Sequence, residues 1–245
     1  MQINIFENPN QMGLESAIVS SQIINAAIKE KGSARIVLST GASQFEFLEH
    51  FIKMDIEWDK VEMFHLDEYI ALPESHPASF RKYLKERFLQ HVNIGKAWLV
   101  DGEDDPQAVV ARLNEEINKA EIDLALIGIG ENAHIAFNDP PADFDEPAPY
   151  KVVNLSDTCK AQQVREGWFP SNDDVPKQAI TMAVPQIMKS NVVISVVPHA
   201  SKAEAIGNTV KQDVNVNVPA TKLKTHPNWK LFLDKKSAAH FYNWV

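Results

Sequence analysis

Apolar residues recur at two spacings along the chain, and each spacing predicts one kind of element. Apolar positions three or four residues apart predict helices, and short continuous apolar runs between polar turns predict strands. The predicted helices cover residues 13–32, 44–54, 79–92, 105–120 and 202–212. The predicted strands lie within residues 2–6, 34–43, 59–69, 96–102, 122–130, 191–201 and the first part of 226–241.

Some segments carry additional signals. Gly32 is a suitable C-cap for the first helix, and Pro106 stands near the first turn of the helix over 105–120. The end of 226–241 is predicted to be a terminal helix, and 178–190 a helix or a mixture. Residues 131–174 are predicted to be largely irregular. Because loops of that length inside compact domains are usually functional, this segment is a candidate part of a site.

The order of the elements predicts the fold class. Strands alternate with helices, and most strand runs are apolar on both faces, which is typical of parallel strands covered by helices. We therefore expect an α/β protein with a single doubly wound, mostly parallel, Rossmann-like sheet and helices on both faces. No repeat, low-complexity tract or linker interrupts the chain, so residues 1–245 are predicted to form one domain.

Composition narrows the function classes. The chain has 245 residues and a formal net charge of -9, which argues against a general nucleic-acid-binding protein. The single cysteine, Cys159, cannot form an internal disulfide and favours a reducing compartment. Neither a signal peptide nor an apolar run long enough to span a membrane is recognisable, so we expect a cytoplasmic protein without a membrane partner.

Four predicted strands end in polar loops. These loops contain "STGAS", "HLDEY", "ENAHIAFND" and "HASK", and they lie far apart in the sequence. A parallel sheet brings the carboxyl ends of its strands to one edge, where ligands bind in open α/β sheets. The loops are therefore expected to meet in one site.

Two of the loops suit a phosphate. Hydroxyl and backbone N–H groups at the start of a helix can bind an anion, and the first loop supplies them from Ser39, Thr40, Gly41, Ala42 and Ser43. Lys202 stands in the first turn of a predicted helix, where a cation is unfavourable unless an anion binds nearby. The structural alternatives are an ordinary capped turn and a flexible surface lysine.

The other two loops suit acid–base chemistry. Asp67 and Glu68 follow a strand, and partial burial would raise the pKa of a general base there. A solvated acidic turn is the alternative, and His65 is expected to be structural rather than a metal ligand. His134 lies near Glu131 and Asp139, and a histidine that titrates near neutral pH can transfer protons. A purely structural histidine is the alternative.

Together these residues resemble a known family. The segments "LDEYIALPESHPASF", "GIGENAHIAFNDP" and "VPKQAITMAV" are similar to those of the glucosamine-6-phosphate deaminase/isomerase family, and the resemblance runs from about Ile36 to the "LDKKSAA" segment. The related 6-phosphogluconolactonases share the fold but carry a different run after the histidine. The resemblance implies ring opening of an amino-sugar 6-phosphate, proton transfer between C2 and C1, and release of ammonia.

The resemblance also implies residue roles. Asp67 would carry the proton between C1 and C2, and His134 would assist ring opening. Asp139 matches the family glutamate that follows "HIAFN". Residues 39–43 and Lys202 would bind phosphate, Glu68 is a further substrate-binding candidate, and Arg165 is the nearest match to a family arginine, about one residue out of register.

The chain departs from the family pattern beside the histidine. The family has Asp-Gly-His where this chain has Asn132, Ala133 and His134, and its glutamate is replaced by the shorter Asp139. An amide cannot stabilise an imidazolium as a carboxylate does, so Glu131 is a candidate replacement. Trp168 and Phe169 are expected near the mouth of the site, where they would change specificity, for example toward a galactosamine epimer.

We therefore expect an amino-hexose 6-phosphate isomerase/deaminase. A 6-phosphogluconolactonase-like hydrolase and a non-catalytic sugar-phosphate sensor are the alternatives. The chemistry consists of proton transfers, so no cofactor and no metal are expected, and "STGAS" lacks the glycine spacing of a dinucleotide site. The family resemblance further implies a homo-oligomer.

Overall fold

The continuous apolar runs form the strands of a parallel sheet. A computed structural model describes residues 1–241, and its large sheet has seven strands in the order β1-β10-β9-β6-β2-β3-β5, all paired in parallel. The predicted α/β class with a parallel sheet is confirmed. The strands are β1 (Gln2–Phe6), β2 (Ala34–Leu38), β3 (Val61–His65), β5 (Lys96–Trp98), β6 (Leu124–Ile127), β9 (Val192–Val197) and β10 (Trp229–Asp234).

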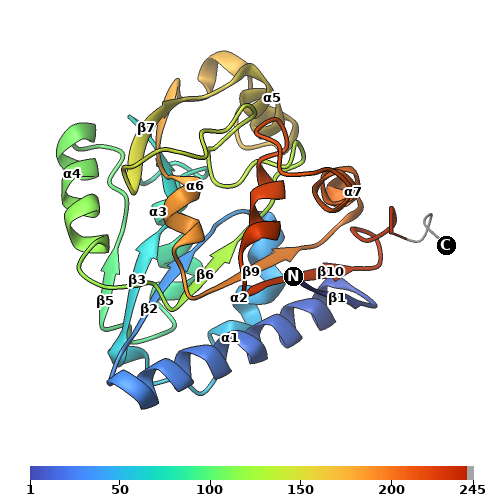
Figure 1. The fold of residues 1–245 in the computed structure, drawn as a ribbon. Coiled ribbons are helices and arrows are strands. Elements are labelled where there is room, and N and C mark those ends of the chain that lie inside the picture. The colour runs from blue at the N-terminus through green and yellow to red at the C-terminus, as the bar shows by residue number, and fades with distance from the viewer. Residues whose placement is uncertain (242–245) are drawn as a thin grey trace.

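Helices cover both faces of this sheet (Figure 1). Asn8 caps the first helix by accepting from the Gln11 amide, and Gly32 ends it at φ 84°, as its position predicted. The α-helices are α1 (Pro9–Lys31), α2 (Phe45–Phe51), α3 (Phe80–Leu84), α4 (Pro106–Ile117), α5 (Asp157–Arg165), α6 (Val184–Met188) and α7 (Ala203–Lys211). Shorter helical turns are η1 (Ala42–Gln44), η2 (Trp58–Lys60), η3 (Lys85–Leu89), η4 (Asn172–Asp174), η5 (Ala200–Lys202) and η6 (Pro219–Thr225).

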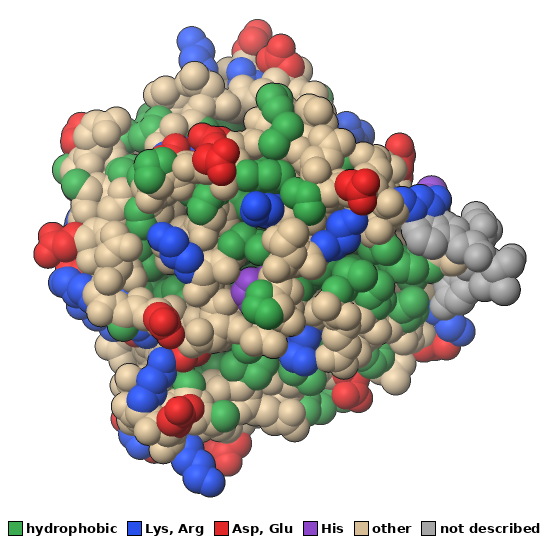
Figure 2. All heavy atoms as spheres, in the orientation of Figure 1, with side chains coloured by type: hydrophobic (Ala, Val, Ile, Leu, Met, Phe, Trp, Pro, Cys, Tyr) green, Lys and Arg blue, Asp and Glu red, His purple; other side chains and the backbone are tan. Residues whose placement is uncertain are grey.

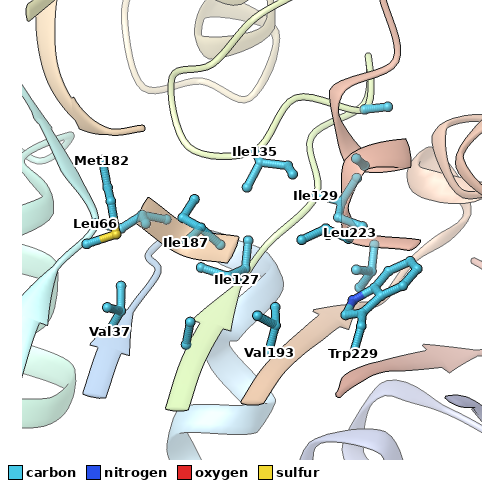
Figure 3. Close-up of a cluster of buried hydrophobic side chains, with 14 of the residues drawn as sticks. Val37, Leu66, Ile127, Ile129, Ile135, Met182, Ile187, Val193, Leu223 and Trp229 are labelled. Carbon is cyan, nitrogen blue, oxygen red and sulfur yellow. The ribbon is translucent and has the colours of Figure 1, made fainter. Parts of the chain in front are cut away.

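The sheet separates two apolar layers. Ile36, Leu124 and Leu126 face α1, α2 and α3, whereas Val37 and Ile127 face α4, α6 and α7. This alternation is what a strand buried on both faces requires. The second layer continues past the strand ends into the loops, where Leu66, Ile129 and Ile135 also pack (Figure 3). The loops that follow the strands are therefore fixed by the core.

A small antiparallel sheet lies beyond the strand ends. It contains β4 (Asp67–Tyr69), β8 (Gln178–Met182) and β7 (Tyr150–Asn154), in the order β4-β8-β7. Leu66 joins the two sheets, because its amide donates to Leu38 of the large sheet and its carbonyl accepts from Met182 of the small one. The strand predicted over 59–69 is thus divided at Leu66, which places Asp67 at the junction of the sheets.

Two further predictions are tested by the structure. Residues 131–174 are largely irregular, as predicted, but they also contain β7 and α5, and Figure 1 shows both on the side toward which the strands of the large sheet point. The terminal helix is wrong: residues 235–241 form turns. Asp234 accepts from the Ser237 amide through its side chain, a local bond that competes with helical pairing.

The surface carries both signs of charge. On the face drawn in Figure 2, acidic and basic side chains are interspersed with apolar ones. Within residues 1–241, no helix is long and apolar enough to cross a membrane.

Candidate active site

The side of the sheet on which the chain adds its strands changes between β2 and β6, which are parallel neighbours. After β2 the chain adds β3 and β5 on one side. It then returns to form β6 next to β2 and adds β9 and β10 on the other side, where β1 forms the edge. Ligands bind at such a point, outside the carboxyl ends of the strands. A cavity of about 350 Å³ lies there, lined by Ser39–Ser43, Leu66, Asp67, Pro77–Phe80, Tyr83, Gly128–Glu131, His134, Ala136, Phe137, Gln162, Gln163, Glu166, Trp168, His199, Ser201 and Lys202.

Part of the cavity lining suits an anion. All five residues of the "STGAS" loop line it, and the buried Ser39 hydroxyl has no partner within the described chain. The Ser43 hydroxyl accepts from Gln44, whose amide also donates to the Val196 carbonyl. This leaves the Ser43 hydrogen available, so two hydroxyls can donate to one ligand.

Lys202 faces the same cavity. Its residue is only 9% exposed, and within residues 1–241 no carboxylate lies within 4.0 Å of its ammonium group. Burial lowers the pKa of Lys202, although Glu166 and Glu131 oppose the shift from a distance. A buried ammonium without a counterion is costly, and a bound phosphate would supply that counterion.

Asp67 is the buried acid of the site. The residue is 6% exposed and its side chain makes no hydrogen bond within residues 1–241. Burial raises the pKa of Asp67 to about 8, and the neighbouring Glu68 charge adds to the shift. A carboxyl group that exchanges its proton near neutral pH is suited to general acid–base catalysis.

Glu68, the adjacent carboxylate, does not line the cavity. It is fully buried, and its oxygens accept from the amides of Tyr69, Phe80 and Arg81 and from the Ser79 hydroxyl. Burial raises the pKa of Glu68, whereas these hydrogen bonds lower it. Glu68 therefore ties β4 to the start of α3, and the geometry gives it no direct contact with a ligand.

His65 is a core histidine. It is fully buried, and burial and the charge of Arg81 lower its pKa to about 3, so the ring is neutral. Nδ1 lies 3.4 Å from the Val100 amide, which donates to it. The structure does not bring His65 into the cavity, in agreement with the structural role expected from the sequence.

His134 lies in a small polar network. Its Nδ1 is 2.6 Å from Asn132 Oδ1 and 3.3 Å from Asp139 Oδ1. The His134 backbone amide also donates to Asn132 Oδ1, so that acceptor is the amide oxygen and Nδ1 must carry the hydrogen. Nε2 is then the unprotonated nitrogen of the neutral ring, and His134 lines the cavity. The ring is oriented to accept a proton from a ligand.

Asp139 completes this network beside His134 Nδ1. Asn132 Nδ2 and the Ser156 hydroxyl donate to its two oxygens at 3.2 and 2.7 Å. Burial would raise the pKa of Asp139, but the bonds and charge of His134, together with Ser156 and Asn132, lower it overall. The shorter carboxylate thus still reaches the histidine, and Asp139 remains ionised.

Backbone geometry shapes the histidine loop. A Cβ on Gly130 would lie 2.1 Å from the His134 ring, so only glycine fits there. Ala133 has φ 64°, a left-handed conformation that favours glycine. This explains why the family pattern has a glycine at that position, and it means that Ala133 holds a strained backbone.

Glu131 lines the cavity, but its partner lies outside it. Arg165 Nη2 is 2.5 Å from Glu131 Oε2, and the Arg165 side chain is 60% exposed. The pair bridges the histidine loop and α5 at the cavity mouth. Glu131 makes no contact with His134, so Asp139 rather than Glu131 supplies the carboxylate beside the ring.

Sequence reasoning missed the contribution of α5 and α3. Gln162 and Gln163 line the cavity from α5, Glu166 lines it from the residue that caps the end of α5, and Phe80 and Tyr83 line it from α3. Helix signals did exist for α5. Ser156 caps its start by accepting from the Cys159 amide, and Gly167 follows its end at φ 83°.

Trp168 lines the cavity, whereas Phe169 does not. Phe169 is 4% exposed and packs against Tyr69 and His76 in a separate apolar cluster. It stabilises the segment that follows α5. Within the described part of the chain, no group of three or more His, Cys, Asp or Glu side chains is arranged to hold a metal ion.

The parallel sheet, the anion pocket and the acid–base side chains at this point of the sheet define an α/β enzyme acting by proton transfer. Residues 8–231 match the model of the glucosamine-6-phosphate isomerases/6-phosphogluconolactonase family, so the chain belongs to this family. Family membership agrees with the resemblance noted in the motifs.

Individual relatives share most of their length with this chain. It is 34% identical to the glucosamine-6-phosphate deaminase of Thermoanaerobacter pseudethanolicus over 98% of this chain and 94% of that protein. It is 35% identical to the deaminase of Halothermothrix orenii over 98% and 99%. A solved structure of a monomeric glucosamine-6-phosphate deaminase superposes with a TM-score of 0.88 at 27% identity, over 98% of this chain and all of the other.

Proposed function

We propose that the protein converts an amino-hexose 6-phosphate, glucosamine 6-phosphate or its galactosamine epimer, to a ketohexose 6-phosphate and ammonia. The observation that carries the proposal is the buried, unpartnered Asp67, whose raised pKa suits proton transfer, in one cavity with His134 and an anion pocket. A hexose 6-phosphate has its phosphate and its reacting carbons at opposite ends, which matches these two groups.

Substrate binding begins at the phosphate. Lys202 and the hydroxyls of Ser39 and Ser43 face the cavity and lack other strong partners there. Phosphate would neutralise the buried ammonium and accept from the hydroxyls. Because this interaction is the same in the ground state and the transition state, it positions the sugar rather than lowering the chemical barrier directly.

Ring opening and proton transfer follow at the other end. His134 Nε2 would take the proton of the C1 hydroxyl and pass it to the ring oxygen as the bond from C1 to that oxygen breaks, and the ionised Asp139 beside Nδ1 would stabilise the transient imidazolium. The Asp67 carboxylate would then remove the C2 proton and return it to C1, while one proton of the C2 ammonium group passes to the C1 oxygen, which leaves a C1 hydroxyl and an imine at C2. Water attacks the imine left at C2, and the C2 nitrogen leaves as ammonia.

The direct test is turnover of both epimers. Ammonia release and ketose phosphate formation should both be observed with glucosamine 6-phosphate or galactosamine 6-phosphate, in a ratio of one to one. The faster substrate identifies the epimer. If neither epimer yields ammonia although both bind, the deaminase assignment is wrong.

A 6-phosphogluconolactonase is the alternative enzyme on the same fold. Its substrate would also use the anion pocket, and His134 would activate water. The unpartnered Asp67 favours proton transfer between carbons, because lactone hydrolysis needs no base at C2. Hydrolysis of 6-phosphogluconolactone, followed by acid release, separates the two activities.

A non-catalytic sugar-phosphate sensor is the alternative from another class. Asn132 motivates it, because an amide stands where the family has a carboxylate beside the histidine. The position of Asp139, 3.3 Å from Nδ1, argues for a working site. Binding measured by calorimetry, with no product after prolonged incubation, would support the sensor.

Three broader expectations accompany this proposal. We propose one domain over residues 1–245 and, from the single Cys159, a reducing cytoplasmic location. A homo-oligomer is expected from the family resemblance, although the deaminase of solved structure is described as monomeric. Light scattering of the purified protein decides between the two states.

A further inference from the structure

Gln163 is a buried polar side chain without a partner. The residue is 9% exposed and lines the cavity from α5, yet its side-chain amide makes no hydrogen bond to any residue in the described part of the chain. Its amide atoms are not fully enclosed by the protein, so they face the open cavity, where a ligand can reach them. The amide offers two donor hydrogens and one acceptor oxygen.

The adjacent Gln162 gives an internal comparison. It has the same side chain, is 7% exposed and lines the same cavity. Its Nε2 donates to Glu166 Oε1 at 2.7 Å, so its amide is satisfied inside the protein. Two neighbouring glutamines thus differ in one respect, which is whether the protein supplies a partner. The protein fixes one of them and leaves the other available.

The remaining cavity groups restrict what Gln163 can bind. Lys202 and Ser39 already provide for an anion, and Asp67 and His134 provide for the reacting carbons. An uncharged group that both donates and accepts is complementary to a hydroxyl, which also does both. The hydroxyls of a hexose phosphate lie on the carbons between its phosphate and its reacting end.

We propose that Gln163 is a specificity-determining residue whose amide binds a chain hydroxyl of the hexose phosphate. This inference rests on the proposed function only in that the ligand is a hexose 6-phosphate. A site that hydrogen-bonds a hydroxyl discriminates strongly against analogues without it, because the bound analogue then covers the amide and leaves it unpaired. Gln163 therefore recognises a hydroxyl of the sugar rather than the phosphate.

The proposal makes opposite predictions for stability and for binding. Replacing Gln163 with leucine removes no hydrogen bond within the protein, so the melting temperature of the free protein should stay the same or rise. Replacing Gln162 with leucine removes a formed hydrogen bond, so the melting temperature should fall. A purely structural role for Gln163 would make both variants less stable.

Binding is measured by calorimetry with two probes that cannot react, an open-chain hexitol 6-phosphate and inorganic phosphate. Gln163→Leu should weaken hexitol phosphate binding about tenfold or more and leave inorganic phosphate unchanged. Gln163→Met repeats the test with a side chain of similar shape. Equal hexitol phosphate affinity in the variant and the original protein would overturn the inference.

Deoxy probes identify the hydroxyl. Hexitol phosphates that lack the C3 or the C4 hydroxyl should bind the original protein more weakly at one position, and at that position Gln163→Leu should cause no further loss. Additive losses at both positions would overturn a direct bond. Because these probes test binding alone, Gln163-dependent binding of the probes together with no ammonia release from either amino-hexose 6-phosphate would contradict the proposed function and leave this inference standing.

Discussion

Two buried aspartates in the site have opposite acidities. Asp67 lies at the junction of the two sheets with no hydrogen-bond donor to its carboxyl group, and its pKa is raised to about 8. Asp139 lies behind the histidine and receives hydrogen bonds from Asn132 and Ser156 beside the ring, and its pKa is lowered. Burial acts on both residues in the same direction, so the lower pKa of Asp139 comes from the hydrogen bond and charge of His134, together with the bonds from Ser156 and Asn132.

The comparison assigns the two roles. A carboxyl group without donors is stable when protonated and can exchange a proton with carbon. A carboxylate with several donors stays ionised and can only orient and stabilise a neighbouring charge. Substitution of either aspartate, or a change of pH, therefore tests one of these two roles.

Replacing Asp67 with asparagine should have the largest effect. The amide cannot carry the proton between C2 and C1, so kcat should fall about 10⁴-fold, the upper range for loss of a general base. Affinity for an unreactive hexitol phosphate should change little. Removing a buried acid without donors should also raise the free energy of unfolding at pH 8, by roughly 2 kcal/mol.

Steady-state kinetics and urea unfolding test this variant. Full activity in Asp67→Asn would exclude Asp67 as the base. A loss of hexitol phosphate binding equal to the loss of kcat would instead indicate a collapsed cavity, which circular dichroism would reveal.

Exchanging the amide and the carboxylate around His134 should have the next largest effect. Asp139→Asn removes the only carboxylate within 4.0 Å of Nδ1 in residues 1–241, and kcat should fall about 100-fold. Asn132→Asp with Asp139→Asn returns a carboxylate to the other side of the ring, because Asn132 Oδ1 is 2.6 Å from Nδ1. The double variant should recover most of the loss.

Rescue would show that the charge beside the ring matters and its position does not. If the double variant is as slow as Asp139→Asn, the bond from Ser156 to Asp139, and hence the link to α5, is the essential feature. Product formation by all three proteins is compared at one pH, with thermal unfolding as the control for folding.

The pH dependence distinguishes the two acids without mutation. Asp67 must be ionised to remove a proton, so kcat/KM should rise about tenfold per pH unit below its pKa and level off above about pH 8. The free energy of unfolding should instead decrease as the pH rises. The folded-state pKa of Asp67 is raised, so between about pH 4 and pH 8 the unfolded chain is ionised while the folded site is protonated, and its stability contribution decreases.

Urea unfolding from pH 5 to pH 9 isolates this contribution from ionisation of the substrate. As the pH rises, the unfolding free energy should fall less steeply in Asp67→Asn than in the original protein. Identical slopes would mean that Asp67 titrates normally, and the contrast with Asp139 would disappear.

The reactive edge of the sheet could be predicted from the sequence because its signals are local. Apolar strands ending in polar loops located Asp67, His134 and Lys202, and a parallel sheet necessarily brings such ends together. The motifs of the family resemblance added roles that spacing alone left open. The same local reasoning could not separate Asp67 from Glu68, because only the fold decides which of two adjacent carboxylates faces the cavity.

The rest depended on long-range pairing. β7 is recognisable as a strand only through its pairing with β8, and without it the segment up to α5 lacks a regular pattern. Gln162 and Gln163 are identical in sequence terms, and the difference between them arises from the position of Glu166. Ser156 and Gly167 were usable helix signals, but their value became clear only beside the strand that precedes them.

The smallest expected effect comes from the backbone of the histidine loop at Ala133. Ala133 has φ 64°, where a Cβ costs roughly 1–2 kcal/mol relative to glycine. Glycine also makes the unfolded chain more flexible, which offsets about 0.4–1 kcal/mol of that gain. Ala133→Gly should therefore stabilise the protein by about 0.5 kcal/mol in urea unfolding. Ala78→Gly, at a buried alanine without positive φ, is the matched control and should destabilise. If both variants are equally destabilised, the loop holds no strain, and the support of His134 by Asn132 and Asp139 is set by side chains alone.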